Sequence, residues 1–354
     1  MTIGKLCLIK IKSITWLIIY EENMSSKFLI IGSNSFTGSH MIDTLLEKDC
    51  QVIGISRSKE MNDVFLPYKW KFKENIRYSF YALDLNHQLE EIKALIKREK
   101  PEFVINFAAQ GMVAQSWLSP EDWYQTNVVS QVKLHDFLRT CDFISKYIHV
   151  STPEVYGSTN RWKKESFDFN PSSPYAVSRA ACDMHLKSFS LAYDFPVIFT
   201  RAANVYGPGQ QLYRIVPRMM MCSELKEKLN LQGGGLSKRS FVYISDVTDA
   251  IFKICMKGEK GKTYHISTNE QISIINLVKL FCLNFNVNYE KLVQISDPRL
   301  GHDDAYMLDS NFIRKSLNWK DKVNIEYGLE KTMKWVKNNI TILKKLPQIY
   351  EHKK

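Results

Sequence analysis

The chain has 354 residues, of which 45% are hydrophobic, and it carries a formal net charge of +11. A chain of this length without repeats or low-complexity segments can bury a sizeable core, which excludes a disordered or fibrous protein and allows two lobes. The positive charge favours anionic ligands such as nucleotides, but the lysines are spread along the chain and their densest run is a terminal tail, so we expect no nucleic acid among the partners.

The seven cysteines are scattered and show neither a C-x-x-C motif nor a Cys/His spacing typical of metal sites. An odd number of dispersed cysteines indicates reduced thiols rather than a disulfide framework. We therefore expect a cytoplasmic protein that holds no metal.

The first 23 residues are partly apolar, but Lys10 and Lys12 interrupt the apolar run. Its unbroken part, 14–20, is seven residues long, whereas a membrane-spanning helix needs about 20. No small-residue cleavage site follows, so a signal peptide is not expected either. We expect residues 1–23 to be an extension outside the fold, with Met24 as the natural start, and no membrane among the partners.

A glycine turn follows the first expected strand. The apolar run 28–31 is typical of a buried parallel strand, and the turn 32–38 leads from it into a helical pattern. Gly32 and Gly38 permit a tight turn and a close approach of a pyrophosphate, while the helix start offers free N–H groups and a positive dipole end. The pattern is typical of dinucleotide binding, although such a turn also occurs where it only connects two elements and binds no ligand.

The second expected strand, 51–55, runs into Ser56 and Arg57. A site for NAD usually has an acidic residue here that binds the ribose 2′-hydroxyl, whereas an arginine accommodates the 2′-phosphate of NADP. Arg57 therefore favours NADP. If Arg57 only stacks on the adenine, NAD remains possible.

The segments 151–157 and 173–179 bring together a Thr, a carboxylate, and a Tyr with a cation four residues later. Residues four apart share a helix face, so the charge of Arg179 can lower the pKa of Tyr175 and make it a base. That pKa has to fall from about 10 to about 7, and one cation about 4 Å away at an effective dielectric of about 20 suffices for this. Taken alone, a tyrosine and an arginine four residues apart also occur on many helices, where they are merely packed and solvated neighbours.

Strand and helix patterns alternate along the chain, which predicts an α/β fold with a doubly wound parallel sheet. Sites in such sheets lie at the carboxyl ends of the strands, where Gly32, Ala108, Thr152 and Asn204 fall. The expected strands lie near 28–32, 51–55, 78–82, 103–107, 146–151 and 196–201, and the expected helices near 37–48, 88–98, 121–140 and 174–193.

The glycine turn and the Tyr175 region, about 140 residues apart and in this order, resemble the extended short-chain dehydrogenase/reductase superfamily. Within it they are most similar to nucleotide-sugar 4,6-dehydratases of the dTDP-glucose and GDP-mannose type. The resemblance runs from about Ser26 to about Asn339. Further matching segments are 106–110 with Val113 and Ser116, 126–129, 201–210, 239–247 and 301–303.

The resemblance implies a Rossmann dinucleotide-binding domain at 24–205, to which the chain returns near 239–251 and 264–267. A smaller substrate-binding lobe follows at 206–340, and we expect the basic tail 341–354 to be solvated. The helices expected at 121–140 and 174–193 carry apolar residues on more than one face. The resemblance implies that one of these faces builds the four-helix interface of a homodimer.

The resemblance also implies a reaction on a nucleotide-diphosphate sugar. Tyr175 takes the proton of the C4 hydroxyl while hydride passes to the nicotinamide, Thr152 hydrogen-bonds the same oxygen, and Arg179 stands where a Lys normally lowers the Tyr pKa and binds the nicotinamide ribose. Glu154 then removes the C5 proton as C6 loses water. Hydride returns to C6, so the product is a 4-keto-6-deoxyhexose and the cofactor is regenerated.

Further site residues follow by position from the same resemblance. The dinucleotide is expected at Gly32, Asn34, Ser35, Phe36, Thr37, Gly38, Arg57, Asp84, Leu85, Ala108, Ala109, Gln110, Asn127, Tyr175 and Arg179. The sugar nucleotide is expected at Ser116, Asn204, Arg218, Arg239 and Arg299. Arginine offers phosphate a bidentate fork, but each of these arginines could instead form an ordinary surface ion pair.

Ser35, Pro153 and Arg179 depart from the family pattern. Ser35 replaces a glycine, which is tolerable if its φ is negative. Pro153 replaces the acid of the dTDP-glucose enzymes, an acid that the GDP-mannose type also lacks. Arg179 replaces a lysine whose contacts a planar guanidinium cannot copy.

Two alternatives to the dehydratase therefore stay open. One is a 4-epimerase or 4-ketoreductase, which generally carries no carboxylate at position 154. The other is a catalytically impaired dinucleotide-binding protein.

Overall fold

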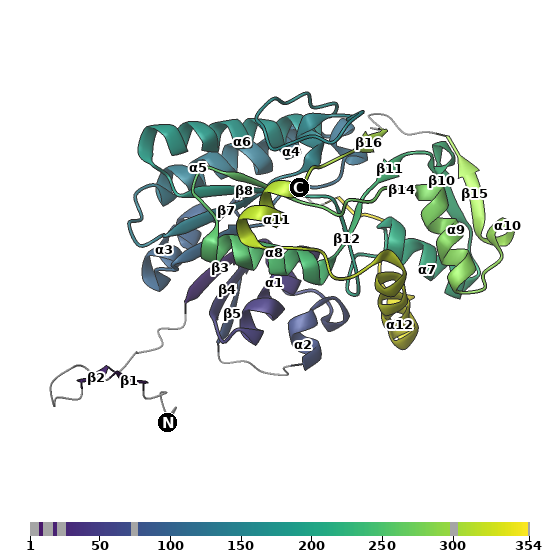
Figure 1. Ribbon diagram of the computed structural model, residues 1–354, viewed down its shortest axis with the longest axis horizontal. Coiled ribbons are helices and arrows are strands. Elements are labelled where there is room, and N and C mark those ends of the chain that lie inside the picture. The colour runs from purple at the N-terminus through teal and green to yellow at the C-terminus, as the bar shows by residue number, and fades with distance from the viewer. Residues whose placement is uncertain (1–6, 10–16, 20–25, 72–76, 298–303, 353–354) are drawn as a thin grey trace.

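A parallel seven-stranded sheet forms the centre of the computed structural model, which describes residues 7–9, 17–19, 26–71, 77–297 and 304–352 (Figure 1). The strand order is β13-β8-β7-β6-β3-β4-β5, so the expected doubly wound α/β fold is confirmed. The strands are β3 (Lys27–Ile31), β4 (Gln51–Ser56), β5 (Tyr78–Ala82), β6 (Phe103–Asn106), β7 (Lys146–Val150), β8 (Val197–Ala202) and β13 (Thr263–Ile266).

Both faces of the sheet are covered, which explains why its strands are nearly continuous apolar runs. Alternate side chains point to opposite faces of a strand. In β3, Phe28 and Ile30 pack with α1 (Phe36–Glu47) and α8 (Ile244–Lys257), whereas Leu29 and Ile31 pack with α3 (Leu89–Glu99), α5 (Ser130–Leu138) and α6 (Pro174–Tyr193).

The helix expected at 121–140 is interrupted. It consists of α4 (Pro120–Tyr124), a π-helical turn at Gln125–Val129, and α5. Such π-turns are frequent at functional sites. Asn127, in the middle of this turn, is fully buried.

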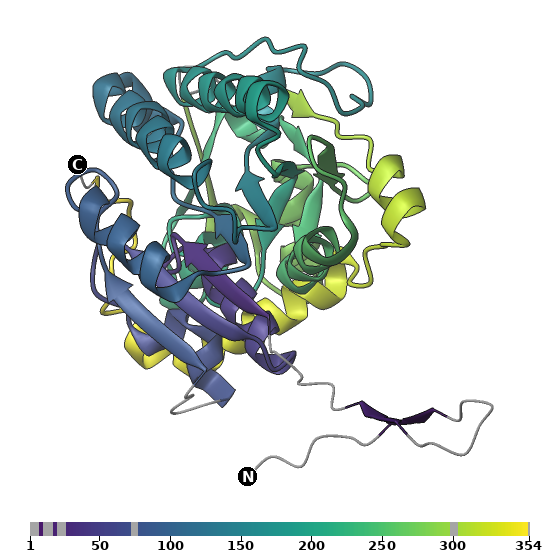
Figure 2. The ribbon, with the colours of Figure 1, turned by 90° about the vertical axis from the view of Figure 1, so that its left-hand side faces the viewer.

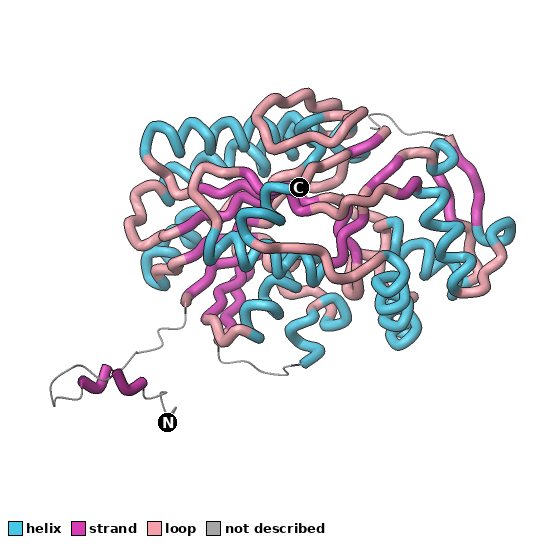
Figure 3. The backbone as a smooth tube through the Cα atoms, in the orientation of Figure 1, coloured by secondary structure: helices cyan, strands magenta, loops and turns pink. Residues whose placement is uncertain are grey.

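A second lobe lies beside the sheet (Figures 1 and 3). Its own core contains Met219, Met220, Leu277, Phe281 and Leu329. Its helices are α7 (Ile215–Leu225), α9 (Ile274–Asn284), α10 (Tyr289–Leu292) and α12 (Ile325–Leu343). Its strand pairs are β10 (Leu229–Gln232) with β15 (Val293–Ser296), and β11 (Lys238–Arg239) with both β14 (Ile272–Ser273) and β16 (Ala305–Tyr306).

Three further elements lie between or beside these lobes. The parallel pair β9 (Asn204–Tyr206) and β12 (Phe241–Tyr243) joins the end of β8 to the start of α8. The short helix α2 (Pro67–Lys71) packs against α1, and α11 (Asn311–Leu317) packs against β13 and α8.

Near the N-terminus, β1 (Cys7–Ile9) and β2 (Leu17–Ile19) pair antiparallel, and their only strand partners in the described part of the chain are each other. The rest of the expected extension, 1–23, lies outside the described residues. None of the helices in the described ranges is both long and apolar enough to cross a membrane.

The tail expected at 341–354 is exposed over most of its described residues, but it also makes contacts that the sequence did not predict. Residues 341–343 complete α12, and the chain then folds back so that its C-terminal end lies against the body of the molecule (Figure 2). Its last described residue, His352, stacks on Trp123 of α4 with ring centroids 4.9 Å apart. Basic composition alone gave no sign of these aromatic contacts.

Candidate active site

The glycine turn has the geometry that the sequence predicts. Gly32 has φ +83°, and a Cβ there would lie 2.7 Å from the backbone nitrogen of Ala108, so only glycine fits. Ser35 has φ −70° and caps α1 by accepting a hydrogen bond from the Gly38 amide at 3.0 Å. Serine in place of the middle glycine is therefore accommodated without strain.

A cavity of about 360 Å³ opens beside this turn, at the carboxyl ends of β3, β4 and β6. It brings together many of the expected cofactor residues, which line it: Gly32, Asn34, Ser35, Arg57, Asp84, Leu85, Ala108, Ala109 and Gln110. A glycine-built turn at a helix start, next to a cavity, fits the pyrophosphate of a dinucleotide.

Asn34 fixes the wall that carries Arg57. Its side-chain amide donates to the carbonyls of Ser58 at 3.1 Å and Lys59 at 2.9 Å, just beyond the end of β4. The glycine turn and the segment after β4, which both line the cavity, are therefore held together. Arg57 itself is on the cavity lining.

Other expected cofactor residues lie outside the lining. Phe36 is buried in the core beside α1, and Gly38 lies inside the turn, where a Cβ would meet the Gly32 carbonyl at 2.5 Å. Thr37, Asn127, Tyr175 and Arg179 do not line the cavity either.

Asn127 does not line the cavity, but its side chain holds a residue of the cavity wall in place. Its side chain accepts from the Gln110 amide at 2.8 Å and donates to the Gln110 carbonyl at 3.1 Å. It also donates to Ser178 Oγ at 3.0 Å. The π-turn thus ties the cavity wall at Gln110 to α6.

Thr152, Glu154, Tyr175 and Arg179 come together at the end of β7 and the start of α6. Thr152 begins a 3-10 turn, Pro153–Tyr156, and its Oγ1 accepts from the Glu154 amide at 3.4 Å. Pro153 occupies the first position of that turn, where a missing N–H costs nothing. Tyr175 is in the first turn of α6, and it forms a side-chain hydrogen bond with Thr152.

The pKa of Tyr175 differs from the sequence prediction, because in this structure it is raised. Burial of the phenol is the largest cause, and the charge of Glu154 acts in the same direction. The charge of Arg179, the bond with Thr152 and the charge of Arg214 all act to lower it. The predicted influence of Arg179 is present, but burial outweighs it.

Arg179 is 2% exposed, and its guanidinium is engaged by strand β7. It donates to the Val150 carbonyl and lies 3.3 Å from Nε2 of His149. These contacts, absent from the sequence prediction, anchor the cation beneath the site. They fix the distance from which its charge acts on Tyr175.

A buried charge network lies next to Arg179. Asp183 of α6 accepts from Arg201 of β8 and from the Ser151 hydroxyl, at 2.7 and 2.8 Å, and lies 3.2 Å from His149 Nε2. Burial opposes ionisation, yet the charge of Arg201 and the His149 contact hold the pKa of Asp183 below its usual range. The sequence reasoning missed this network, because nothing in the spacing of 149, 183 and 201 reveals it.

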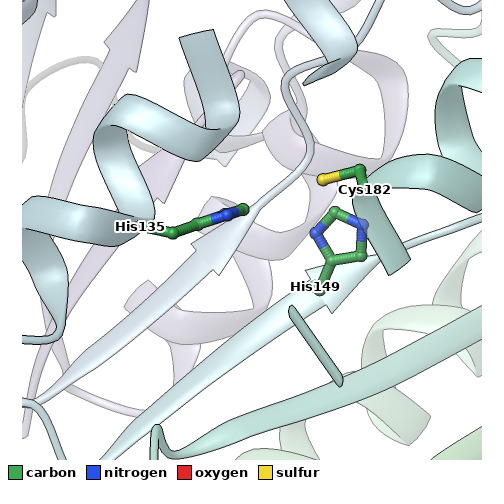
Figure 4. A group of neighbouring side chains, drawn as sticks. All are labelled: His135, His149 and Cys182. Carbon is green, nitrogen blue, oxygen red and sulfur yellow. The ribbon is translucent and has the colours of Figure 1, made fainter. Parts of the chain in front are cut away.

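His135, His149 and Cys182 form a compact buried group from α5, β7 and α6 (Figure 4). Their potential ligand atoms all lie within 4.8 Å of one another. The nearby guanidinium groups of Arg179 and Arg201 disfavour a further cation here. Burial lowers the pKa of both histidines and raises that of Cys182 to about 12, which favours a neutral packed group.

The expected substrate residues lie away from the lining of the cavity. Ser116 is buried and donates to the Val113 carbonyl at 2.6 Å, and Asn204 lies on β9. Arg218 is 3.5 Å from Glu227, whereas Arg239 donates to the carbonyls of Lys238 and Asp304 and lies over the Tyr306 ring. Arg299 lies outside the described residues.

Comparison with known proteins identifies the family. The family model for GDP-mannose 4,6 dehydratase matches residues 29–332. The chain belongs to this family. A mouse dTDP-D-glucose 4,6-dehydratase is 31% identical over 325 residues, covering 90% of each chain. The predicted relationship to nucleotide-sugar 4,6-dehydratases is therefore confirmed.

Solved structures agree with this membership of the dehydratase family. A dTDP-glucose 4,6-dehydratase from Streptomyces venezuelae, with NAD bound, has a TM-score of 0.81 at 26% identity, covering 89% of this chain and 98% of its own. A UDP-glucose 4-epimerase from Thermotoga maritima, with UDP-glucose, has a TM-score of 0.80 at 26% identity, covering 89% and 99%. Dehydratases and epimerases thus share this fold.

The sequence reasoning missed several residues around the site of this dehydratase-family chain. Arg214 acts on the pKa of Tyr175, and Gln211, Leu212 and Tyr213 line the cavity from the second lobe. The C-terminal segment also contributes to the lining, at Pro347, Ile349, Tyr350 and Glu351. Loops and termini carry no periodic pattern, so no signal in the sequence placed them here.

Proposed function

We propose that the protein is a nucleotide-sugar 4,6-dehydratase, which converts an NDP-hexose into an NDP-4-keto-6-deoxyhexose. The observation that carries the proposal is the meeting of Thr152, Glu154 and Tyr175 next to a dinucleotide-type turn. A hydroxyl, a carboxylate and a phenol at one place are the groups that oxidation at C4 and proton removal at C5 require.

When bound, an oxidised nicotinamide dinucleotide supplies a positively charged ring that accepts hydride from C4 and later returns it at C6. Tyr175 accepts the C4 hydroxyl proton, and Thr152 orients the phenol through their hydrogen bond. Arg179 and Arg214 oppose the burial that raises the pKa of Tyr175, and the positive charge that a bound ring would supply would act in the same direction as these arginines.

Glu154 performs the step that defines a dehydratase. The 4-ketone acidifies C5–H, and the Glu154 carboxylate takes that proton and passes it to the departing C6 hydroxyl, which leaves as water. One group thus serves as base and acid, which agrees with Pro153 having no proton to donate.

Glu154 also separates this reaction from epimerisation, because the fold does not. The dehydratase and epimerase structures match the chain almost equally well, with TM-scores of 0.81 and 0.80. An epimerase needs no base at C5 and generally has no carboxylate at this position.

For the cofactor, we propose NADP, because Arg57 lines the cavity where NAD sites usually carry an acid. NAD is the alternative, since the Streptomyces relative holds it. For the sugar nucleotide, we propose Ser116, Asn204, Arg218, Arg239 and Arg299, with the arginines reaching the diphosphate. A cytoplasmic location fits the cysteines at 50, 141, 182, 222, 255 and 282, which are buried free thiols.

We further propose that the protein is a homodimer through a four-helix interface. Helices α4 and α6 pack against each other, and they expose apolar side chains at Tyr124, Val177, Met184 and Leu191. Exposed apolar side chains gathered on neighbouring helices are typical of an interaction surface.

Mass spectrometry of products tests the dehydratase proposal. The protein is incubated with NADP or NAD and, separately, dTDP-glucose, UDP-glucose, UDP-N-acetylglucosamine, CDP-glucose and GDP-mannose. We expect one substrate to lose the mass of water. An epimer of unchanged mass, separated from its substrate by chromatography, would favour the epimerase, and no conversion of any substrate would favour an impaired enzyme.

A further inference from the structure

The C-terminal segment closes one side of the cavity. After α12 ends at Leu343, Gln348 donates to the carbonyls of Leu343 and Leu346, at 2.9 and 3.0 Å, which redirects the chain. The next residues, 349–351, then line the same cavity as the glycine turn. We call 347–352 the C-terminal strap.

The strap is fastened beyond the cavity by its last described residue. The ring of His352 is stacked on Trp123 at 4.9 Å with an interplanar angle of 11°. Its Nε2 lies 2.8 Å from a carboxylate oxygen of Asp122. Because α12 belongs to the second lobe and α4 to the sheet domain, the strap spans both lobes.

Tyr350 occupies the middle of the strap. Its hydroxyl lies 3.4 Å from Oε1 of Gln110, and its ring packs edge-on against Tyr213 at 5.5 Å. The charges of Arg57 and Arg214 both act on the pKa of Tyr350, which burial raises. Tyr350 thus lies close enough to Arg57, at the expected adenosine end, and to Arg214 for both charges to act on it, and Arg214 also acts on Tyr175.

We propose that the C-terminal strap closes over a bound nicotinamide dinucleotide, with Tyr350 against the cofactor and His352 fastening the strap to α4. The inference rests on the proposed function, since it places a dinucleotide in this cavity. Residues from a separate segment that line the same cavity as the pyrophosphate turn add to retention of the cofactor when the ligand cannot leave until they move. The strap is thus a cofactor-binding element and takes no part in proton transfer.

Release of the reduced cofactor tests the strap in the full chain. NADPH and NADH are bound in turn, an excess of the oxidised form is mixed in, and the loss of nicotinamide fluorescence gives the dissociation rate. Tyr350→Ala removes the contact, and His352→Ala and Asp122→Asn unfasten the strap. Lys345→Ala, at an exposed neighbour that does not line the cavity, is the matched control.

We expect Tyr350→Ala and His352→Ala each to raise the dissociation rate at least about fivefold, the effect of losing one aromatic contact. Lys345→Ala should release the cofactor at the wild-type rate. Asp122→Asn should raise the dissociation rate little further when His352→Ala is already present, because both changes break the same contact.

Two results would overturn the proposal that the strap retains the cofactor. If Tyr350→Ala and His352→Ala released the cofactor at the wild-type rate, the strap would not retain the cofactor. If these variants bound the cofactor more tightly, the segment would block the cavity instead. Failure of the wild-type protein to bind either dinucleotide would be a different outcome, since it would overturn the proposed function together with the strap.

Discussion

The pKa of Tyr175 is set by the groups that surround its phenol. Its pKa is raised by burial and by Glu154, while Arg179, Thr152 and Arg214 oppose the rise. The two groups that the reaction uses are thus coupled, because an ionised Glu154 disfavours an ionised Tyr175. A bound cation at the site relieves this conflict for both.

The role of Glu154 as the base at C5 gives the sharpest prediction at this scale. A positioned general base contributes about 10²- to 10⁴-fold, so Glu154→Gln should slow loss of water by that factor. Oxidation at C4 depends on Tyr175, so reduced nicotinamide and an undehydrated 4-keto hexose should accumulate, visible by absorbance and mass spectrometry. Tyr175→Phe should abolish both signals. Full turnover by Glu154→Gln would falsify the dehydratase assignment.

Arg57 is predicted to set the cofactor preference. Charged hydrogen bonds are worth about 1.5–3 kcal/mol, so Arg57→Ala should weaken NADPH binding by roughly 10- to 100-fold and leave NADH binding nearly unchanged. Titration of nicotinamide fluorescence measures both affinities. Lys59→Ala, another exposed cation two residues on, is the control. Equal losses for both cofactors would contradict the preference for NADP.

At the scale of elements, the buried network around Asp183 joins α6 to β7 and β8. Asp183 bonds Arg201 and Ser151, and its side chain is fully buried. The same helix carries Tyr175 and Arg179. The network therefore fixes the position of Tyr175, the proposed catalytic base, through the backbone of α6.

Removing the Asp183 charge is predicted to destabilise the protein. Asp183→Asn leaves Arg201 buried without its carboxylate, which costs about 3–5 kcal/mol and lowers Tm in calorimetry. Because the folded-state pKa of Asp183 is depressed, its contribution is present above the unfolded pKa and is lost as pH falls through the folded value. Stability should therefore fall in acid more steeply for wild type than for Asp183→Asn.

The control for this variant is Asp168→Asn. Asp168 pairs with Lys163 at the surface, and its side chain is 84% exposed. Its loss should change the free energy of unfolding by less than about 0.5 kcal/mol. A small effect at Asp183 as well would mean that the buried network is not what holds α6.

The exposed face of α6 is predicted to be the dimer interface. Met184 is 59% exposed, and a charge there cannot be buried against a partner, so Met184→Glu should yield a monomer in analytical ultracentrifugation. Leu283→Glu on α9, where the side chain is 80% exposed, should leave the mass unchanged. A wild-type monomer would contradict the interface.

At the scale of the whole molecule, the sequence predicted what depends on local pattern. Six of the seven strands of the sheet, the glycine turn and the grouping of Thr152, Glu154 and Tyr175 follow from periodicity and short motifs. The position of the strap, the Asp183 network and the π-turn at Asn127 depend on contacts between distant segments, which no local pattern encodes. The prediction of a lowered pKa for Tyr175 was wrong for the same reason, because burial is a property of the folded chain.

The N-terminal residues are predicted to be dispensable. The strands β1 and β2 pair only with each other among the described strands, and the family match begins at residue 29. A protein starting at Met24 should keep the Tm and the turnover of the full chain. Aggregation of the shortened protein would indicate that the removed residues cover an apolar surface.

The strap and the glycine turn line one cavity although they lie near opposite ends of the chain. During synthesis, at about 5–20 residues per second, the glycine turn leaves the ribosome long before Tyr350. A nascent chain can therefore fold its sheet with the cavity still open, and the cavity is completed only after the strap has been synthesised. A tag fused behind His352 would alter the segment that completes it, whereas a tag at the N-terminus would not.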